Sequence, residues 1–261
     1  MYDFELVKPS SIADAAKAMG ADGAQALSGG QTLLPTMKQR LASPAVLVSL
    51  TGIAEMQGVC RGDGGLHVGG ATPHAVVARE AHAHYPALAS LAGGIGDPAV
   101  RNRGTIGGSI ANNDPAACYP AAVLGSGAIV VTNRRQIAAD DYFQGMFTTA
   151  LDEGEFVIEV RFPIPQKAAY VKFNQPASRF ALTAVFVAKF ADGVRVAVTG
   201  ASNDGVFRWT EAEKALSADF SAGAIAGLTV DASDMISDLH GTPAYRANLV
   251  KVLTGRAVTA A

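Results

Sequence analysis

The chain has 261 residues, of which 49 % are hydrophobic and only 17 % are charged, against about 25 % charged in a typical soluble protein. This length fits one large domain or two to three small ones. With a net charge of −2 and no block of basic residues, the composition argues against nucleic acid or an anionic membrane as a partner. The shortage of charge favours surface that is buried against other subunits.

Local signals predict a small βαβ-like unit at the start of the chain. Ser11 to Asp14 reads as a capping box, and Gly20 is the expected stop of an alanine-rich helix. A short strand is expected at 24–27. Pro35 fits the first turn of a brief helix that runs to about residue 40, and an apolar strand at 45–50 closes the unit.

The middle of the chain reads as short strands that alternate with short helices. Its longest apolar run, 115–131, is interrupted by Pro120, Gly125 and Gly127, so it does not match a membrane helix of about 20 apolar residues. The strands are expected at 66–69, 128–132 and 156–162, and the helices at 72–83, at 86–92 and from about 116.

Beyond Pro176 the pattern changes to that of a small strand-and-helix domain. Two strands, 184–190 and 194–199, flank Asp192-Gly193, which predicts a hairpin with a type I′ turn. Helical patterns follow at 209–216 and 245–258. A domain boundary is therefore expected near residue 170.

The first residues of the chain and its two cysteines bear on the cellular compartment. The first residues carry no basic segment followed by an apolar one, so we expect no secretory signal. Cys60 and Cys118 are far apart and lack metal-ligand spacing. We expect reduced thiols in the cytoplasm, and any iron–sulfur cluster or zinc on another chain.

Two glycine-rich segments, Leu27–Leu33 and Arg103–Pro115, are the most informative part of the sequence. Each places a Gly-Gly pair directly before small hydroxyl or amide residues. Paired glycines allow a tight turn in which several N–H groups point the same way and no side chain blocks a ligand. Two such segments suit the pyrophosphate of a dinucleotide. A single Gly-Gly pair usually marks only a turn, but anion binding explains the presence of two such segments in one chain.

The common nucleotide-binding loops do not fit. The first segment lacks G-x-G-x-x-G, its helix is only about two turns long, and the following strand ends at Ser49-Leu50-Thr51 without the acidic residue that holds a ribose. No Gly-Lys-Ser/Thr occurs, which excludes a P-loop. The sequence therefore predicts a dinucleotide site of a different kind.

Other polar residues near these segments leave two interpretations open. Arg101 and Arg103 are either surface or salt-bridge charges or part of the site. Asp114 either caps the following helix or accepts hydrogen bonds from a ribose. His74 is expected to be structural rather than a ligand contact. No Ser/His/Asp, Cys/His or metal-binding arrangement is apparent, so the chemistry would come from a bound cofactor.

The glycine segments also carry a resemblance to a known family, and three further stretches continue it along nearly the whole chain. The chain resembles the FAD-binding medium subunit of molybdenum-containing hydroxylases, the xanthine dehydrogenase and aerobic carbon monoxide dehydrogenase family. The stretches that carry the resemblance are Ser28–Lys38, Val68–His74, Val100–Ser109, Asp114-Pro115, Pro176–Ala181 and Tyr245–Arg256.

The resemblance implies an α+β fold, in which FAD lies between two subdomains of the vanillyl-alcohol-oxidase-like type. A C-terminal domain with a three-stranded antiparallel sheet and helices follows. The implied divisions are 1–55 for the N-terminal FAD-binding subdomain, 56–169 for the second, and 170–261 for the C-terminal domain.

The resemblance also implies which residues hold the cofactor. The first segment would wrap the pyrophosphate and part of the flavin, and the second would form the opposite wall. The backbone at 156–157 would meet the adenine, and Phe180 would shield the ring. Family members usually carry an acidic residue where this chain has Cys118, which puts that contact in doubt. The implied residues are Leu27, Ser28, Gly29, Gly30, Gln31, Thr32, Leu33, Gly104, Thr105, Gly107, Gly108, Ser109, Asp114, Phe156, Val157 and Phe180.

The implied function is electron transfer. A large partner would hold the molybdenum cofactor and oxidise the substrate, and a small partner with two 2Fe–2S clusters would pass electrons to non-covalently bound FAD on this chain. The assembly would be a dimer of heterotrimers in the cytoplasm, or peripheral at the inner membrane. Two alternatives are a stand-alone flavin-binding protein and a small flavin oxidase.

Overall fold

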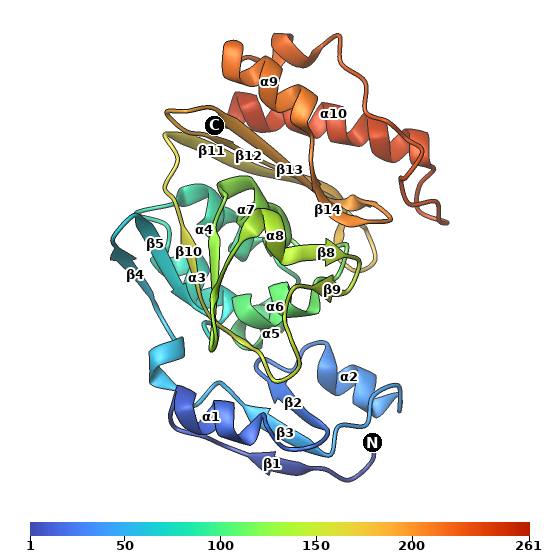
Figure 1. Ribbon diagram of the computed structural model, residues 1–261. Coiled ribbons are helices and arrows are strands. Elements are labelled where there is room, and N and C mark those ends of the chain that lie inside the picture. Colours follow the sequence, from blue (N-terminus) through green and yellow to red (C-terminus); the bar gives the residue numbers. More distant parts are fainter.

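The computed structural model describes all residues from 1 to 261, and it consists of three units stacked along one direction (Figure 1). The N-terminal unit lies at one end, the C-terminal sheet and its helices lie at the other, and a central unit of strands and helices lies between them. No helix combines the length and the apolar character needed to cross a membrane.

The N-terminal unit is a three-stranded parallel sheet with strand order β1-β3-β2. The expected βαβ unit is present, because β2 and β3 pair in parallel around α2. Ser11 is confirmed as the N-cap residue of α1: its Oγ accepts a hydrogen bond from the N–H of Asp14 at 3.1 Å, and it donates to the Asp14 carboxylate at 2.7 Å. The elements are β1 (Glu5–Val7), α1 (Ile12–Ala18), β2 (Ala24–Leu27), α2 (Leu33–Lys38) and β3 (Val46–Ser49).

The central unit is built on a five-stranded antiparallel sheet with strand order β4-β5-β10-β6-β7. A small hairpin, β8 and β9, stands apart from this sheet. The strands are β4 (Val59–Gly62), β5 (Gly65–Gly69), β6 (Ile129–Thr132), β7 (Gln136–Ala138), β8 (Phe143–Gly145), β9 (Thr148–Thr149) and β10 (Val157–Phe162). The helices are η1 (Ala54–Met56), α3 (His74–Glu80), α4 (Pro86–Gly93), α5 (Pro98–Arg103), α6 (Ile106–Asn112), α7 (Tyr119–Ser126) and α8 (Ala139–Tyr142).

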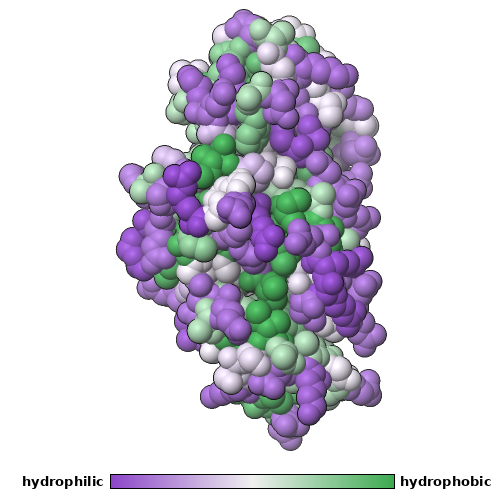
Figure 2. Space-filling model, turned by 60° about the vertical axis from the view of Figure 1, so that its left-hand side comes forward, coloured by the Kyte–Doolittle hydropathy of each residue, from purple (hydrophilic) through white to green (hydrophobic).

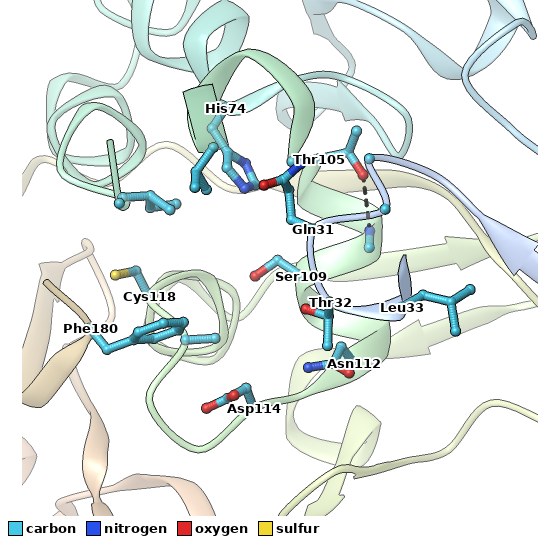
Figure 3. A pocket seen from close by; sticks show the side chains of 18 of the residues that line it. Gln31, Thr32, Leu33, His74, Thr105, Ser109, Asn112, Asp114, Cys118 and Phe180 are labelled. Carbon is cyan, nitrogen blue, oxygen red and sulfur yellow. Dashed lines mark hydrogen bonds between the residues drawn. The ribbon is translucent and has the colours of Figure 1, made fainter. Parts of the chain in front are cut away.

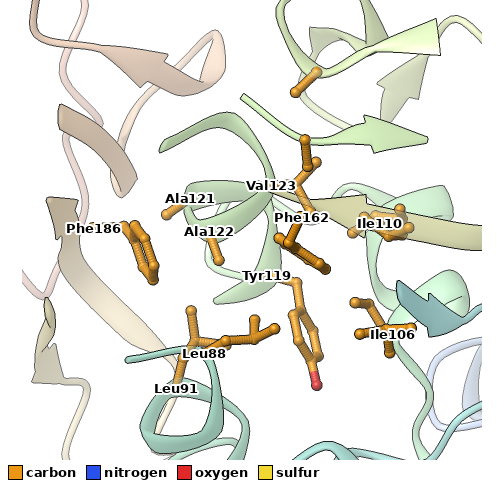
Figure 4. Close-up of a cluster of buried hydrophobic side chains, with 14 of the residues drawn as sticks. Leu88, Leu91, Ile106, Ile110, Tyr119, Ala121, Ala122, Val123, Phe162 and Phe186 are labelled. Carbon is orange, nitrogen blue, oxygen red and sulfur yellow. The ribbon is translucent and has the colours of Figure 1, made fainter. Parts of the chain in front are cut away.

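The long apolar run in the sequence becomes α7, a helix that is buried on every side. All eight of its residues are buried, which explains why no polar face interrupts the run. Figure 4 shows its alanines and Val123 packed between Leu88 and Leu91 of α4, Phe162 of β10 and Phe186 of the C-terminal sheet. This helix therefore joins the central unit to the C-terminal one.

The C-terminal sheet has four antiparallel strands, in the order β11-β12-β13-β14, where three were expected. The additional edge strand, β14, is only four residues long and runs directly into a helix, so it carries too few alternating positions to be recognised. The elements are β11 (Lys167–Asn174), β12 (Ala181–Lys189), β13 (Val194–Ser202), β14 (Gly205–Arg208), α9 (Thr210–Ala218), η2 (Ala222–Ile225) and α10 (Pro243–Ala260).

The predicted hairpin at 192–193 forms, but its turn is not of type I′. The strands end with Lys189 opposite Val194, which leaves a four-residue loop. A type I′ turn needs a positive φ at both central residues, and Asp192 is not among the residues that have one. Both faces of this hairpin are covered, by α9 and α10 on one side and by the central unit on the other (Figure 1).

Three hydrophobic clusters correspond to the three units. The smallest surrounds α1 and β3, the largest surrounds α7, and the third lies between α10 and the C-terminal sheet. Phe186 of β12 packs into the central cluster, while its neighbours Val185 and Val187 pack toward α10. The smallest cluster also includes Met56, Ala71 and Phe156 of the central unit, and β11 begins at Lys167. The division at 1–55, 56–169 and 170–261 stays a prediction.

Candidate functional site

A cleft of about 800 Å³ lies where the three units meet. Its walls are the loop after β2, the segment from residue 95 to residue 118 around α5 and α6, and the loop at 177–180 before β12. This volume falls within the range of about 300–1,000 Å³ that is usual for small-molecule and cofactor sites. The cleft therefore brings the two glycine segments into one site.

The first glycine segment presents its backbone to the cleft. Residues 27–33 all line it. The backbone N–H groups of Ser28, Gly29, Gly30, Gln31 and Thr32 donate no hydrogen bond within the chain. A run of free N–H groups beside a Gly-Gly pair is the arrangement that binds phosphate groups.

The two glycine segments touch directly. Ser28 Oγ and Thr105 Oγ1 share a hydrogen bond of 2.7 Å. A Cβ atom on Gly29 would lie 2.1 Å from the carbonyl oxygen of Arg103, so only glycine permits this approach. The contact holds the first segment against the start of α6.

The second glycine segment differs from an open anion-binding turn. It forms the first turn of α6, and Thr105 is the N-cap residue. The N–H groups of this first turn already have partners: Ile106 donates to Thr72 O, Gly107 donates to Gly70 O, and Gly108 donates to Thr105 Oγ1 at 3.3 Å (Figure 3). The run of consecutive free N–H groups therefore belongs to the first segment, and the first turn of α6 contributes side chains and close packing.

Three of the expected site residues do not line the cleft. Gly107 is buried because its Cα lies against Gly70, where a Cβ would come within 2.6 Å of the carbonyl oxygen. Phe156 and Val157 are 2 % and 4 % exposed and belong to two hydrophobic clusters. The strand that Val157 begins lies at the centre of the five-stranded sheet, so sheet pairing rather than a ligand occupies this stretch of backbone. The contact of these three residues with the cofactor therefore stays a prediction.

The other expected residues do line the cleft, and several residues that the sequence did not indicate join them. Phe180 is 52 % exposed and forms part of the wall. The expected residues found there are Leu27, Ser28, Gly29, Gly30, Gln31, Thr32, Leu33, Gly104, Thr105, Gly108, Ser109, Asp114 and Phe180. The residues that were missed include Ile95, Gly96, Asp97, Asn112, Phe147, Lys172 and Arg179.

Arg101 and Asp114 have structural partners. Arg101 donates from Nη1 to the carbonyl oxygens of Ile95 and Gly96, both at 3.0 Å, and so holds the turn that forms part of the cleft wall. Asp114 Oδ1 accepts a hydrogen bond from the N–H of Ala116 at 2.8 Å. The second carboxylate oxygen of Asp114 has no partner in the chain and remains available to a ligand hydroxyl.

His74 lies in the wall as a neutral side chain. Burial, with a smaller effect of nearby Arg101, lowers its pKa to about 4. Its ring packs against Tyr119 with centroids 5.3 Å apart, and its Nδ1 atom is buried without a hydrogen-bond partner. A Cβ on Gly104 would lie 2.6 Å from its Nε2 atom, so glycine at this position makes room for the ring. His74 is suited to shaping the cleft rather than carrying charge.

One end of the cleft is chemically different from the glycine end. Figure 3 shows Phe180 and Cys118 across the cleft from Thr32 and Leu33. The Nζ atom of Lys172 lies 3.7 Å from Cys118 Sγ. An aromatic ring and a thiol at one end, with free N–H groups at the other, suit an elongated ligand that has phosphates and a flat ring.

Known proteins are similar to this chain in sequence and in fold. Residues 2–165 match the family model described as the FAD binding domain in molybdopterin dehydrogenase. The chain is 32 % identical to the nicotine 6-hydroxylase medium subunit of Paenarthrobacter nicotinovorans, over 97 % of this chain and 95 % of that one. It is 30 % identical to the glyceraldehyde dehydrogenase medium chain of Sulfolobus acidocaldarius, over 98 % and 97 % of the two chains.

A solved structure, carbon monoxide dehydrogenase from Hydrogenophaga pseudoflava, matches all of this chain and 97 % of its own with a TM-score of 0.87 and 32 % identity. The family match covers most of the chain, and the free N–H groups beside the Gly29 contact fit a cofactor that carries phosphates. The chain therefore belongs to the family of FAD-binding medium subunits of molybdenum hydroxylases.

Proposed function

We propose that this chain is the FAD-carrying electron-transfer subunit of a molybdenum-containing hydroxylase. The observation that carries the proposal is the run of free N–H groups from Ser28 to Thr32, held against the start of α6 inside a cleft of about 800 Å³. Free N–H groups favour the pyrophosphate of a dinucleotide. The opposite end of the cleft, with Phe180, provides a surface for a flat ring.

We propose distinct roles for the cleft residues toward non-covalently bound FAD. The backbone of 28–32 would hold the pyrophosphate, and Gly104, Thr105, Gly108 and Ser109 would form the facing wall. The free oxygen of Asp114 would accept a hydrogen bond from a hydroxyl of the cofactor. When bound, FAD supplies the two-electron chemistry that protein side chains lack.

The proposed function places the other steps on partner chains. The related proteins are called medium subunits or medium chains, and one related structure is described as lacking the Mo-pyranopterin moiety of its molybdenum cofactor. We propose that a large subunit with this cofactor oxidises the substrate, and that a small subunit with 2Fe–2S clusters delivers the electrons to FAD. A dimer of these heterotrimers, in the cytoplasm or peripheral at the inner membrane, is the proposed assembly.

The molecular surface supports such an assembly. Figure 2 shows one face on which hydrophobic residues gather along the middle, with hydrophilic residues on both sides. Only 17 % of the residues are charged. Apolar surface within a polar rim is typical of protein–protein interfaces.

Acid precipitation of the purified chain tests the cofactor. We expect all of the yellow colour in the supernatant and FAD as the released compound. Flavin that stays with the pellet, or FMN alone in the supernatant, would contradict non-covalent FAD binding. Thr105→Val removes the hydroxyl that caps α6 and bonds Ser28, and it should lower FAD occupancy, whereas Thr210→Val, at an exposed hydroxyl far from the cleft, should not.

Native mass spectrometry of the protein purified from its host tests the assembly. We expect two further subunits, one with molybdenum and one with iron and acid-labile sulfide. A lone chain that reduces an acceptor directly from substrate would favour a small flavin oxidase. A lone chain that binds FAD without any such activity would favour a stand-alone flavin-binding protein.

A further inference from the structure

Lys172 places a fixed positive charge in the wall of the cleft. It lies on β11, and its Nζ atom donates hydrogen bonds to the carbonyl oxygens of Gly94 at 2.7 Å and Arg179 at 3.1 Å. The same Nζ atom lies 3.7 Å from Cys118 Sγ. These three partners come from three separate segments of the chain. The ammonium group is therefore held in place by neutral atoms on several sides.

The charge of Lys172 has no carboxylate partner. None of the ion pairs in the structure includes it. The two carboxylates that line the cleft accept hydrogen bonds elsewhere: Asp97 from the N–H of Val100 and Asp114 from the N–H of Ala116. The field of the ammonium group is therefore not cancelled locally and extends into the cleft.

Lys172 lies at the end of the cleft opposite the first glycine segment. It contacts Cys118 and bonds to the residue directly before Phe180. Figure 3 places Cys118 and Phe180 opposite Thr32 and Leu33. Under the proposed function, the pyrophosphate would lie against residues 28–32 and the flavin ring at the Phe180 end, beside Lys172.

Resting on the proposed function, we propose that Lys172 tunes the reduction potential of the bound FAD. Two electrons and one proton convert the oxidised ring into a reduced ring that carries one negative charge, and the electrons come from the reduced clusters of the small subunit. A nearby ammonium group stabilises that negative charge more than it stabilises the neutral oxidised ring. Lys172 therefore makes the cleft bind reduced FAD more tightly than oxidised FAD and raises the midpoint potential.

Two substitutions at Lys172 separate its charge from its hydrogen bonds. Lys172→Gln keeps a hydrogen-bond donor and removes the charge, whereas Lys172→Arg keeps both. We expect Lys172→Gln to change the ratio of the dissociation constants for reduced and oxidised FAD about tenfold, which for a two-electron couple is a fall of about 30 mV in midpoint potential. Lys172→Arg should keep a potential near that of the wild type. Lys167→Gln, at an exposed lysine on the same strand, is the matched control and should leave the potential unchanged.

A substitution at Cys118 tests the same charge with Lys172 intact. Cys118→Asp places a carboxylate beside the ammonium group and cancels its field, while the bonds of Lys172 to Gly94 and Arg179 remain. It should lower the potential in the same direction as Lys172→Gln. Cys118→Ser, which has a similar size and no charge, should not. This pair decides the question if Lys172→Gln fails to fold.

The measurement is a spectroscopic reductive titration of the full chain loaded with FAD, together with FAD affinity by fluorescence. A lower potential in Lys172→Gln or Cys118→Asp, with the controls unchanged, supports the inference. Bound FAD with a wild-type potential in the folded charge-altering variants overturns it. A wild-type chain that binds no FAD would instead contradict the proposed function.

Discussion

Gly29→Ala is the sharpest test of the way the two glycine segments meet. The new Cβ atom would lie 2.1 Å from the carbonyl oxygen of Arg103 and 2.7 Å from the Cα atom of Gly104. Both neighbours are backbone atoms, so no side chain can rotate away. Because Cβ atoms do not approach other heavy atoms closer than 3.0 Å, the two segments must separate by about 1 Å.

The cost of this separation follows from the contacts it breaks. The 2.7 Å hydrogen bond between Ser28 and Thr105 would stretch beyond hydrogen-bonding range, a loss of about 1 kcal/mol. The steric overlap adds about 1–3 kcal/mol. We expect the free energy of unfolding to fall by about 2–4 kcal/mol and, since the free N–H groups are displaced, FAD affinity to fall about a hundredfold.

Urea unfolding and fluorescence titration with FAD measure the two effects separately. Gly227→Ala is the matched control, because its Cβ would meet no atom within 4 Å and its φ is not positive. It should leave both quantities near the wild-type values. A Gly29→Ala protein with wild-type stability and wild-type FAD affinity would refute the contact as described.

The remaining predictions concern pH and two further positions. Burial lowers the pKa of His74 from 6.5 to about 4 in the folded chain. As the pH falls below ~6.5, the unfolded chain therefore binds a proton that the folded chain does not, and the free energy of unfolding decreases. Urea unfolding should show ~2 kcal/mol less stability at pH 5 than at pH 7, and His74→Gln should reduce this difference. Gly108→Val should weaken FAD binding in a fluorescence titration with little change in circular dichroism, because Gly108 lines the cleft and its φ is not positive; full flavin occupancy would contradict its place in the site. Glu155 is buried and forms hydrogen bonds with Arg135 and Thr132. Glu155→Gln should therefore reduce the free energy of unfolding by about 1–3 kcal/mol and lower the melting temperature. An unchanged melting temperature would show that these hydrogen bonds contribute little to stability.

The sequence by itself determined the features that depend on neighbouring residues. Ser11 caps its helix because the N–H of Asp14 is only three residues away, and the hairpin after Lys189 follows from two apolar strands around Asp192-Gly193. The glycine segments were identified because tight turns require glycine wherever they occur. These signals were sufficient to indicate the family and 13 of the 31 residues that line the cleft.

Some elements were missed although local signals existed. Asp97 accepts a hydrogen bond from the N–H of Val100, and Pro98 occupies the first position of α5, which is a usual helix start. The helix α6 was not recognised, because two glycines in its first turn have poor helix propensity. The capping bond from Thr105 and the packing of Gly107 on Gly70 compensate for that propensity in the folded chain.

Only the tertiary structure decided which residues share the cleft. Phe156 and Val157 were expected to meet the cofactor, and sheet pairing and core packing leave them outside the lining of the cleft. Lys172 carries no local signal, and it reaches the site because β11 crosses beside Gly94 and Cys118, residues more than fifty positions away in the sequence. Caps and turns follow from interactions over a few residues, whereas a site at the meeting of three units depends on contacts that no local pattern encodes.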